Sequence, residues 1–469
     1  MNINRAIGRL VRLFVIAYLI LFARQLYVQV VAGPHLAENP HNPRLALLAP
    51  YRGSILARDG TVLAQSSSHG RLYPLGRALA HAVGYASERY GTSGLEAAFD
   101  EALAPRSLGN DPISQVEQIV GLQPAAPALR GASVVTTIDP AVQGTLYAAL
   151  AAYPRAAGVA LDPRTGEVLA LASVPSFDPA RIDEGFPAAR ADPASPLLNR
   201  ALDGLYPPGS TFKIFTAAAA LEAGVVTMAS TYDDGGSYPV GNFVVHDDES
   251  EATGRQDLTG AFALSSNVDF AQIALALGTD RWYAAAHRWK LGEPLGFTLP
   301  VAPDRLPVRS QMTPGVLAQL GFGQADLLVT PLRMAVVAAT IAEGGTTPRP
   351  YLVRALRSDG RDRAVAAPSA LAAPISRAVA GDVRDLMVAV VQRGTGTSAA
   401  LRDVEVAGKT GTATNPAGRS HSWFVAFAPA GAPRVAVAVV VENAGYGAAV
   451  AAPIVKRVIA SALARDRAL

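Results

Sequence analysis

The sequence predicts a mixed α/β fold of the α+β kind, with a central, largely antiparallel sheet covered by helices. Strand patterns occur at 133–138 and 157–173, before a block of helical patterns, and again at 405–442, after it. The segment 157–173 is a predicted hairpin because a Pro-Arg-Thr-Gly turn divides it. Strands on both sides of a helical block imply one sheet with helices packed against it.

Apolar periodicity predicts the remaining elements of this domain. An irregular, proline-rich path is expected from 174 to 209. The expected elements are helices at 140–152, 215–221, 258–277 (with one interruption), 378–392 and 454–464, two helices within 314–345, and strands at 405–412, 421–428 and 435–442.

A smaller module precedes this domain. Residues 52–64 predict a β-hairpin around Asp59-Gly60, and 79–90 and 94–103 carry helical spacing. The composition then shifts over 104–132 toward Pro, Gly, Ala and Gln, which marks a boundary. We therefore expect an N-terminal module at 32–132, which begins with a polar linker at 38–50, and a second domain at 133–469.

The first forty residues predict a membrane anchor. Arg5, Arg9 and Arg12 precede the apolar run 13–23, and no acidic residue occurs before Glu38. This bias predicts a cytoplasmic N-terminus at 1–9 and an extracytoplasmic main chain. The run is shorter than the roughly 20 residues that a spanning helix needs, but one helix over 10–31 is long enough. A cleaved signal peptide is the alternative, and the lack of a clear small-x-small cleavage site favours the uncleaved anchor.

Composition excludes several classes of function. The net charge of +3 over 469 residues, without a basic stripe, gives no reason to expect nucleic acid as a partner. Cysteine is absent, which excludes disulfides, thiolate nucleophiles and cysteine metal sites. The cluster 246–249 (His-Asp-Asp-Glu) lacks metal-ligand spacing, so we expect a polar turn there.

Ser210 is the candidate nucleophile. Pro207, Pro208 and Gly209 break the preceding structure, and an alanine-rich apolar run follows, so Ser210 is expected near a helix N-terminus. Lys213 would then lie on the same face one turn later. A serine hydroxyl becomes a good nucleophile when a neighbouring base takes its proton. The alternative is an ordinary N-cap serine followed by a solvated lysine.

Lysine usage favours the catalytic interpretation. Only four of the 41 basic residues are lysines, at 213, 290, 409 and 456, and the others are arginines. A buried ammonium can release its proton, whereas a guanidinium cannot. A lysine retained at 213 therefore indicates a titratable amine.

Two further motifs belong to the same argument. Ser265-Ser266-Asn267 interrupts an apolar helical stretch, and Lys409-Thr410-Gly411-Thr412 follows a strand pattern. Taken singly, the first motif is better explained by a polar helix end, and the alternative for the second is a strand with a glycine bulge. The functional interpretation of the second motif is a strand edge that binds a peptide and its carboxylate.

The order Ser-x-x-Lys, Ser-x-Asn, Lys-Thr-Gly resembles the penicillin-recognising serine acyltransferases, which are the penicillin-binding proteins and serine β-lactamases. The stretches 198–201, 321–324 (followed by 330–332), 394–396 and 422–424 resemble transpeptidase domains. The stretches 52–64 and 94–96 resemble the N-terminal module of the monofunctional, class B members, including the small actinobacterial-type enzymes. The resemblance extends from Arg52 to the C-terminus. It implies the fold of the penicillin-binding-protein transpeptidase domain, with its central antiparallel sheet and helical subdomain.

The resemblance also implies a peptidoglycan D,D-transpeptidase. Ser210 would attack the penultimate D-alanine of a stem peptide and form an acyl-enzyme, with Lys213 as the general base. Ser265 would relay a proton to the leaving nitrogen, and Asn267 would bind the substrate amide. No metal or organic cofactor is implied.

The Lys409-Thr410-Gly411-Thr412 segment would bind the substrate carboxylate. Backbone N–H groups of Ser210 and Thr412 would form an oxyanion hole. β-Lactams would acylate Ser210. A polytopic glycosyltransferase of the shape, elongation, division and sporulation family would be the partner at the plasma membrane.

Two alternatives remain open from the sequence. Ser210-Thr211-Phe212-Lys213 is shared with class D β-lactamases, although the anchor and the N-terminal module argue against that class. A catalytically weak penicillin sensor or scaffold is the second alternative. A bifunctional synthase is excluded because the module before 133 is too short for a glycosyltransferase domain.

Overall fold

The computed structural model describes residues 3–27, 52–67, 70–104, 106–107, 128–247, 252–415 and 418–466. Helix α1 spans Ile3–Leu26. Among the described residues, no helix combines the length and the apolarity that crossing a membrane requires. The predicted span at 10–31 ends outside the described residues and stays a prediction. The expected linker at 38–50 and most of the boundary segment 104–132 also lie outside them.

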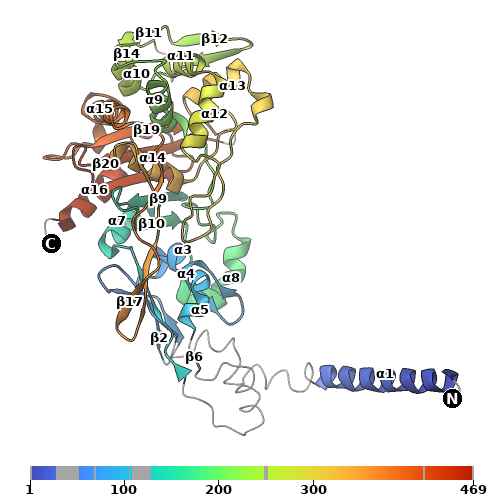
Figure 1. The fold of residues 1–469 in the computed structure, drawn as a ribbon. Coiled ribbons are helices and arrows are strands. Elements are labelled where there is room, and N and C mark those ends of the chain that lie inside the picture. Colours follow the sequence, from blue (N-terminus) through green and yellow to red (C-terminus); the bar gives the residue numbers. More distant parts are fainter. Residues whose placement is uncertain are drawn as a thin grey trace.

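The centre of the molecule is a five-stranded antiparallel sheet (Figure 1). In this sheet the hairpin predicted at 157–173 lies beside the last three strands of the chain. This arrangement confirms the predicted mixed α/β class. In spatial order the strands are β10 (Val168–Val174), β9 (Ala156–Leu161), β21 (Val435–Val441), β20 (His421–Ala428) and β19 (Ala407–Ala413). Strand β19 lies at one edge.

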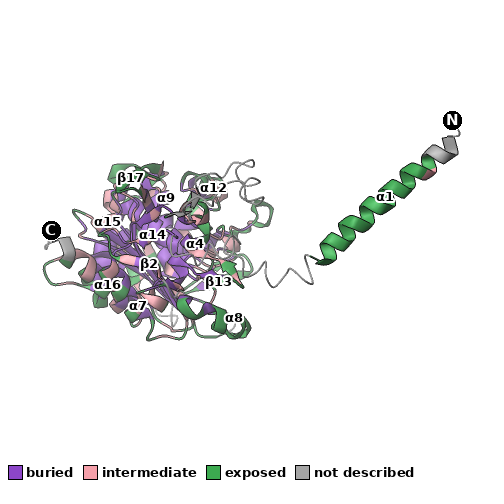
Figure 2. Ribbon diagram, turned by 90° about the horizontal axis from the view of Figure 1, so that it is seen from below, coloured by how far each residue is buried: buried purple, intermediate pink, exposed green. Residues whose placement is uncertain are grey.

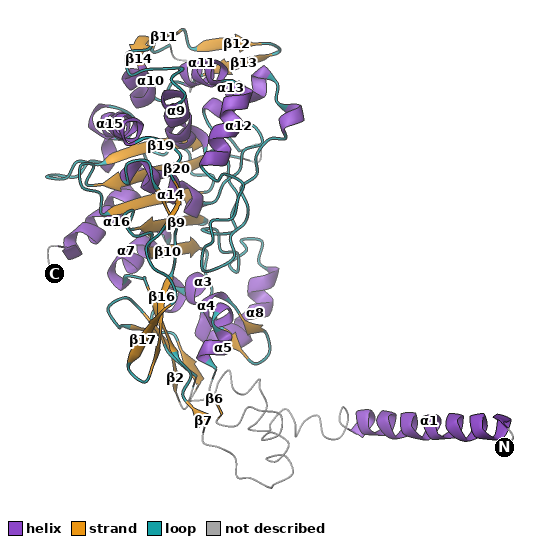
Figure 3. Cartoon of the chain, viewed as in Figure 1, coloured by secondary structure: helices purple, strands orange, loops and turns teal. Residues whose placement is uncertain are grey.

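Helices cover both faces of this sheet (Figure 3). Helices α7 (Pro140–Leu150) and α16 (Ala451–Asp466) pack on one face, and α14 (Pro331–Ala342) packs on the other. Along β20, Phe424 belongs to the core on the α7 side, and Trp423 and Val425 belong to the opposite core. Because both faces are covered, every residue of β20 and β21 is buried. Figure 2 shows that buried residues fill the interior of the main body.

A second sheet combines the N-terminal module with later parts of the chain. The predicted hairpin at 52–64 is confirmed, and Gly60 provides the positive φ of its turn. Strand β8 pairs in parallel with β1, so the sheet contains strands from both sides of residue 132. In spatial order the strands are β17 (Arg361–Ala364), β16 (Val353–Ser358), β8 (Ser133–Thr136), β1 (Ile55–Leu56), β2 (Val62–Ser67) and β3 (Gly70–Leu72).

The predicted helix at 79–90 is wrong beyond Val83. Gly84 has a φ of +81°, and its ideal Cβ would lie 1.9 Å from the backbone oxygen of Ser93, so the chain turns away there. The short elements of this region are α3 (Ala80–Val83), β4 (Ala86–Ser87), β5 (Gly91–Thr92), α4 (Gly94–Ala98), α5 (Asp100–Leu103), β6 (Arg106–Ser107) and β7 (Ala128–Leu129).

A helical subdomain lies beyond the edge strand β19 (Figure 1). Its helices are α9 (Lys213–Glu222), α10 (Leu258–Leu264), α11 (Asn267–Leu277), α12 (Thr279–Arg288), α13 (Pro314–Gly321) and α15 (Arg377–Arg393). Two small hairpins cap it, β11 (Thr231–Asp234) with β14 (Gly254–Asp257) and β12 (Ser237–Val240) with β13 (Phe243–His246). A further pair is β15 (Thr347–Pro348) with β18 (Ala370–Ala372).

Helix α8 (Ile182–Ala191) was not predicted, because the path before Ser210 is proline-rich. Pro187 lies inside the helix, and Ile182 is its one buried residue. The sequence therefore carries no apolar stripe there that would indicate a helix.

Candidate active site

Ser210 lies in a single 3-10 turn (Gly209–Phe212) that runs directly into α9. This location agrees with the predicted position near a helix N-terminus. Lys213 is the first residue of α9 and is completely buried, which contradicts the solvated-lysine alternative. Gly209 has a φ of +54°, and its ideal Cβ would lie 2.8 Å from the backbone oxygen of Thr412. The serine turn is therefore packed tightly against β19.

The second motif forms the turn between α10 and α11. Ser265 ends α10 in the left-handed conformation, with a φ of 67°, and Ser266 caps α11 by accepting a hydrogen bond from the backbone N–H of Asp269. This is the interruption that the sequence predicts. A non-glycine residue in this conformation costs about 1–3 kcal/mol and persists where its surroundings fix it. The turn directs Ser265 and Asn267 toward Lys213 at the N-terminus of α9.

The amine of Lys213 contacts both residues of that turn. Its Nζ donates to the backbone oxygen of Ser265 at 2.5 Å and to Oδ1 of Asn267 at 2.8 Å, and it lies 3.2 Å from Oγ of Ser265. The ring of Phe270 lies beneath it, 5.4 Å from Nζ to the centroid. The first two motifs are thus one connected group.

Lys409 joins the third motif to this group. Its side chain is completely buried on β19, and Nζ donates to Oγ of Ser265 at 2.8 Å. The hydroxyl of the next residue, Thr410, lies 2.6 Å from that of Thr395, which belongs to the Gly-Thr-Gly stretch. Three segments that are far apart in the sequence therefore meet at one serine hydroxyl.

These residues border a cleft of about 440 Å³. Ser210 is half-buried and lines it, whereas Asn267 and the two buried lysines are not among the residues that line it. The predicted residues that line it are Ser210, Ser265, Thr410 and Thr412; Asp247, Thr253, Leu264, Ser266, Thr395, Tyr446, Gly447 and Ala448 complete the wall. The sequence did not assign Asp247 or Tyr446 to the active site: Asp247 belongs to the cluster 246–249, where a polar turn was expected, and Tyr446 lies in no recognisable motif.

An ionic network holds the chain that leads to Ser210. The hydroxyl of Tyr206 donates to Oε1 of Glu442 at 2.8 Å, and Nε of Arg200 donates to the same oxygen at 2.8 Å. The indole of Trp423 donates to the backbone oxygen of Pro207 at 3.1 Å. Together these bonds tie the serine turn to β20 and to the end of β21.

The chemistry available here is serine-based acyl transfer. The hydroxyls of Ser210 and Ser265 both line the cleft, and the buried amines of Lys213 and Lys409 lie close to that of Ser265. Within the part of the chain that the structure describes, no group of three or more His, Cys, Asp or Glu side chains could hold a metal ion.

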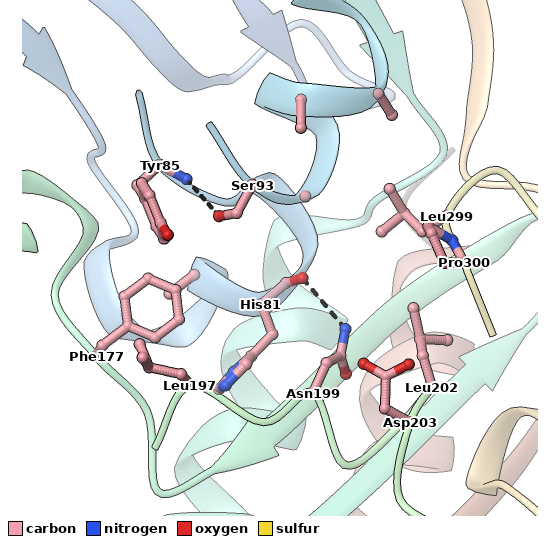
Figure 4. A pocket seen from close by; sticks show the side chains of 14 residues that line it. His81, Tyr85, Ser93, Phe177, Leu197, Asn199, Leu202, Asp203, Leu299 and Pro300 are labelled. Atoms are coloured by element: carbon pink, nitrogen blue, oxygen red, sulfur yellow. Dashed lines mark hydrogen bonds between the residues drawn. The ribbon is translucent and has the colours of Figure 1, made fainter. Parts of the chain in front are cut away.

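A second cavity, of about 530 Å³, lies where the N-terminal module meets the central domain (Figure 4). Its walls are mainly apolar. Nε2 of His81 donates to the backbone oxygen of Pro196 at 2.9 Å, and the side-chain nitrogen of Asn199 donates to the backbone oxygen of His81 at 3.2 Å. The predicted catalytic residues lie elsewhere, so this cavity is not part of the candidate site.

The fold and the cleft define a serine acyltransferase of the penicillin-recognising class. Residues 156–460 match the family model of the penicillin binding protein transpeptidase domain. Residues 52–122 match the penicillin binding protein A dimerisation domain. The chain belongs to the penicillin binding protein transpeptidase family.

Known relatives match nearly the full length of the chain. The peptidoglycan D,D-transpeptidase PbpA of Mycolicibacterium smegmatis is 36% identical, over 98% of this chain and 99% of its own. A D,D-transpeptidase domain structure from Eggerthella lenta is 34% identical, covers 89% of this chain and 99% of its own, and has a TM-score of 0.79. The penicillin G acyl-enzyme structure of penicillin-binding protein A from M. tuberculosis is 34% identical, covers 88% of this chain and 100% of its own, and has a TM-score of 0.77.

Proposed function

We propose that this chain is a peptidoglycan D,D-transpeptidase that cross-links stem peptides and is acylated by penicillins. The observation that carries the proposal is that Lys213 and Lys409 both contact the hydroxyl of Ser265, which lines the same cleft as Ser210. The relatives support it, since one is named a D,D-transpeptidase and another is a penicillin G acyl-enzyme.

In the proposed first step, Oγ of Ser210 attacks the carbonyl carbon of the penultimate D-alanine, and its proton passes to Lys213. Lys409 brings a second positive charge to Ser265, and two like charges so close together favour the neutral form of one of them. The C–N bond to the terminal D-alanine breaks, Ser265 passes its proton to the leaving nitrogen, and Lys213 returns the proton it took to Ser265. Asn267 supports this step by fixing the amine of Lys213.

In the second step an amine of another stem peptide attacks the ester, and Ser210 is released. The Lys409-Thr410-Gly411-Thr412 segment binds the terminal carboxylate, because it provides a cation and hydroxyls along the edge strand β19. The backbone N–H groups of Ser210 and Thr412 serve as the oxyanion hole. Loss of one such donor typically costs about 10²–10³ in rate.

We also propose that the N-terminal segment anchors the enzyme in the plasma membrane. In this proposal 1–9 are cytoplasmic, 10–31 span the bilayer, 32–132 form the N-terminal module and 133–469 the transpeptidase domain. The arginine bias before the apolar run supports this orientation.

A polytopic glycosyltransferase is the proposed partner, in contact with the anchor. Replacing residues 1–31 by an unrelated membrane anchor is expected to abolish co-purification of the two proteins. Co-purification that survives the exchange would overturn the anchor as the contact.

The test of the proposed function is acylation of the full chain, in detergent, by a fluorescent penicillin. Labelling that requires Ser210 and persists for many minutes supports a transpeptidase. Labelling that decays within seconds, with hydrolysed antibiotic accumulating, identifies a β-lactamase instead. Labelling of a Ser210→Ala variant at the rate of the natural chain would exclude Ser210 as the nucleophile.

A further inference from the structure

Two buried carboxyl groups lie directly behind the turn that carries Ser265 and Asn267. Asp234 ends β11 and Asp247 follows β13, and their exposed fractions are 3% and 9%. Oδ1 of Asp247 accepts hydrogen bonds from the backbone N–H of Asn267 and, at 3.3 Å, of Val268. Asp247 therefore caps the first turn of α11. It also lines the cleft.

The second carboxyl oxygen of Asp247, Oδ2, bears on how Asp247 and Asp234 interact. Oδ2 is buried and receives no hydrogen bond from an N–H or O–H group in the described residues. The carboxyl of Asp234 lies next to that of Asp247, since the backbone N–H of Asp247 donates to the backbone oxygen of Gly236 at 3.2 Å and the N–H of Gly236 donates to Asp234. Asp234 accepts hydrogen bonds from the backbone N–H of Gly236 at 2.7 Å and from the hydroxyl of Thr253 at 2.6 Å. Two carboxylates are acceptors only, so they bond to each other when one is protonated. A proton on Asp247 that is donated to Asp234 satisfies both groups.

The surrounding charges agree with one shared proton. Burial and the bond to Asp234 raise the pKa of Asp247 to about 7, against the opposing effect of Lys213 on α9. Burial acts to raise the pKa of Asp234, but bonds from Asp247, Thr253 and Gly236 outweigh it and lower the pKa. Asp269 on α11 also faces the pair, and burial raises its pKa to about 6. Below about pH 7 the pair therefore carries a single negative charge.

Asn267 is the link from this pair to the reacting groups. Its backbone N–H is held by Asp247, and its side-chain nitrogen donates to the backbone oxygen of His246 at 3.1 Å. These two contacts leave Oδ1 of Asn267 facing the amine of Lys213 at 2.8 Å. Movement of the 246–247 segment would therefore displace an oxygen that orients the proposed base.

We propose that Asp247, through the proton it shares with Asp234, is a positioning residue for acyl transfer, because it fixes Asn267 against Lys213. This inference rests on the proposed function. It adds a requirement outside the three motifs: the carboxyl pair must hold one proton for the turn to stay in place.

The inference predicts a specific pH dependence. As the pH rises through about 7, the shared proton leaves and two buried carboxylates repel each other. The new charge also favours the protonated form of Lys213, which is inactive as a base. Both effects slow acylation at high pH. An amide at 247 can accept from Asn267 and donate to Asp234, so Asp247→Asn mimics the protonated pair and lacks this titration.

The experiment measures acylation of the full chain in detergent by benzylpenicillin, between pH 6 and 8.5. Asp247→Ala is expected to lower the limiting acylation rate at least 30-fold at pH 6, with little change in the concentration that gives half that rate. Asp247→Asn is expected to recover most of this loss. The ratio of the rate of the natural chain to that of Asp247→Asn is expected to fall three- to tenfold as the pH rises.

Asp139→Ala is the matched control, because Asp139 caps α7 by the same double contact, to the N–H groups of Ala141 and Val142, far from the cleft. It is expected to lower thermal stability without changing acylation. A ratio to Asp247→Asn that stays constant with pH would overturn the inference, whether or not Asp247→Ala folds. So would acylation of a folded Asp247→Ala within twofold of the natural chain. If the natural chain itself is not acylated, the proposed function fails first.

Discussion

The amine of Lys409 lies 2.8 Å from the hydroxyl oxygen of Ser265, although 144 residues separate them in the sequence. Lys213 reaches the same oxygen from the other side, at 3.2 Å. Both lysines are completely buried, and each lies over an aromatic ring. The two amines share one environment, but the proposed mechanism gives them different roles: Lys213 would take a proton, and Lys409 would keep its charge.

Exchange of each lysine for arginine separates these tasks. Lys213→Arg is expected to lower the acylation rate at least about 10²-fold, because a guanidinium does not act as a base. Lys409→Arg keeps the positive charge, so we expect a loss of less than about tenfold. The measurement is penicillin acylation at pH 7.5, with thermal unfolding as the control for folding. Equal losses in both variants would contradict the assignment of the base.

Glu442→Gln tests the network that holds the serine turn. Glu442 accepts from Arg200 and Tyr206, and the Arg200 side chain is 3% exposed, so the change leaves a buried cation unpaired. We expect a loss of about 3 kcal/mol in the free energy of unfolding and slower acylation. Asp362→Asn is the control, because its ion pair with Arg357 is solvent-exposed and should contribute far less to stability. Equal losses in the two variants would refute the argument.

Glu96→Gln is expected to damage stability but not chemistry. Glu96 is completely buried and pairs with Arg52 at 2.8 Å and with Arg71 at 2.7 Å. Removal of this charge leaves the buried guanidinium of Arg71 without its carboxylate and Arg52 with Asp100 alone, at a cost of about 3–5 kcal/mol. Denaturant unfolding measures the loss. The acylation rate of the folded fraction should stay within twofold, and a large fall would show that the N-terminal module contributes to the active site.

Because His81 is buried, we expect the stability of the protein to depend on pH. Burial is the main reason that its pKa falls from 6.5 to about 4, and the charge of Arg200 adds to this effect. Between these two values the unfolded chain binds more protons, so stability is complete above about pH 6.5 and decreases as the pH falls toward 4. The decrease should reach about 3 kcal/mol.

Thermal unfolding between pH 7 and 4 measures this dependence. His81→Gln should remove most of it. His287→Gln should leave it unchanged, because the side chain of His287 is 77% exposed. If the pH dependence of stability survives in His81→Gln, groups other than His81 cause it.

The sequence predicts the central sheet and the long helices because their signals are local. Strands β20 and β21 are continuous apolar runs, and Thr313 and Thr330 mark the starts of two helices as N-caps. Helix α8 and the two hairpins over the helical subdomain escape prediction because their residues are mostly exposed and lack a strong apolar period. Their structure depends on tertiary contacts.

In the candidate site, too, residues with a local sequence signal could be predicted and residues without one could not. Ser210, Lys213 and Ser265 could be predicted because their motifs have distinctive spacing. Asp247 was expected to belong to a plain polar turn, because nothing in its neighbouring sequence indicates that it caps α11 and faces Asp234. Residues that act by supporting other residues carry no motif, so only the three-dimensional arrangement reveals them.

The most direct test of the account is to locate the penicillin adduct on the chain. Trypsin cleaves after Arg200 and Lys213, so the peptide 201–213 contains the serine turn and can be sequenced by tandem mass spectrometry. We expect the mass of benzylpenicillin on Ser210 of this peptide, with Thr211 unmodified and no adduct in Ser210→Ala. An adduct on any other residue, or an unmodified 201–213 peptide from fully acylated protein, would contradict Ser210 as the nucleophile.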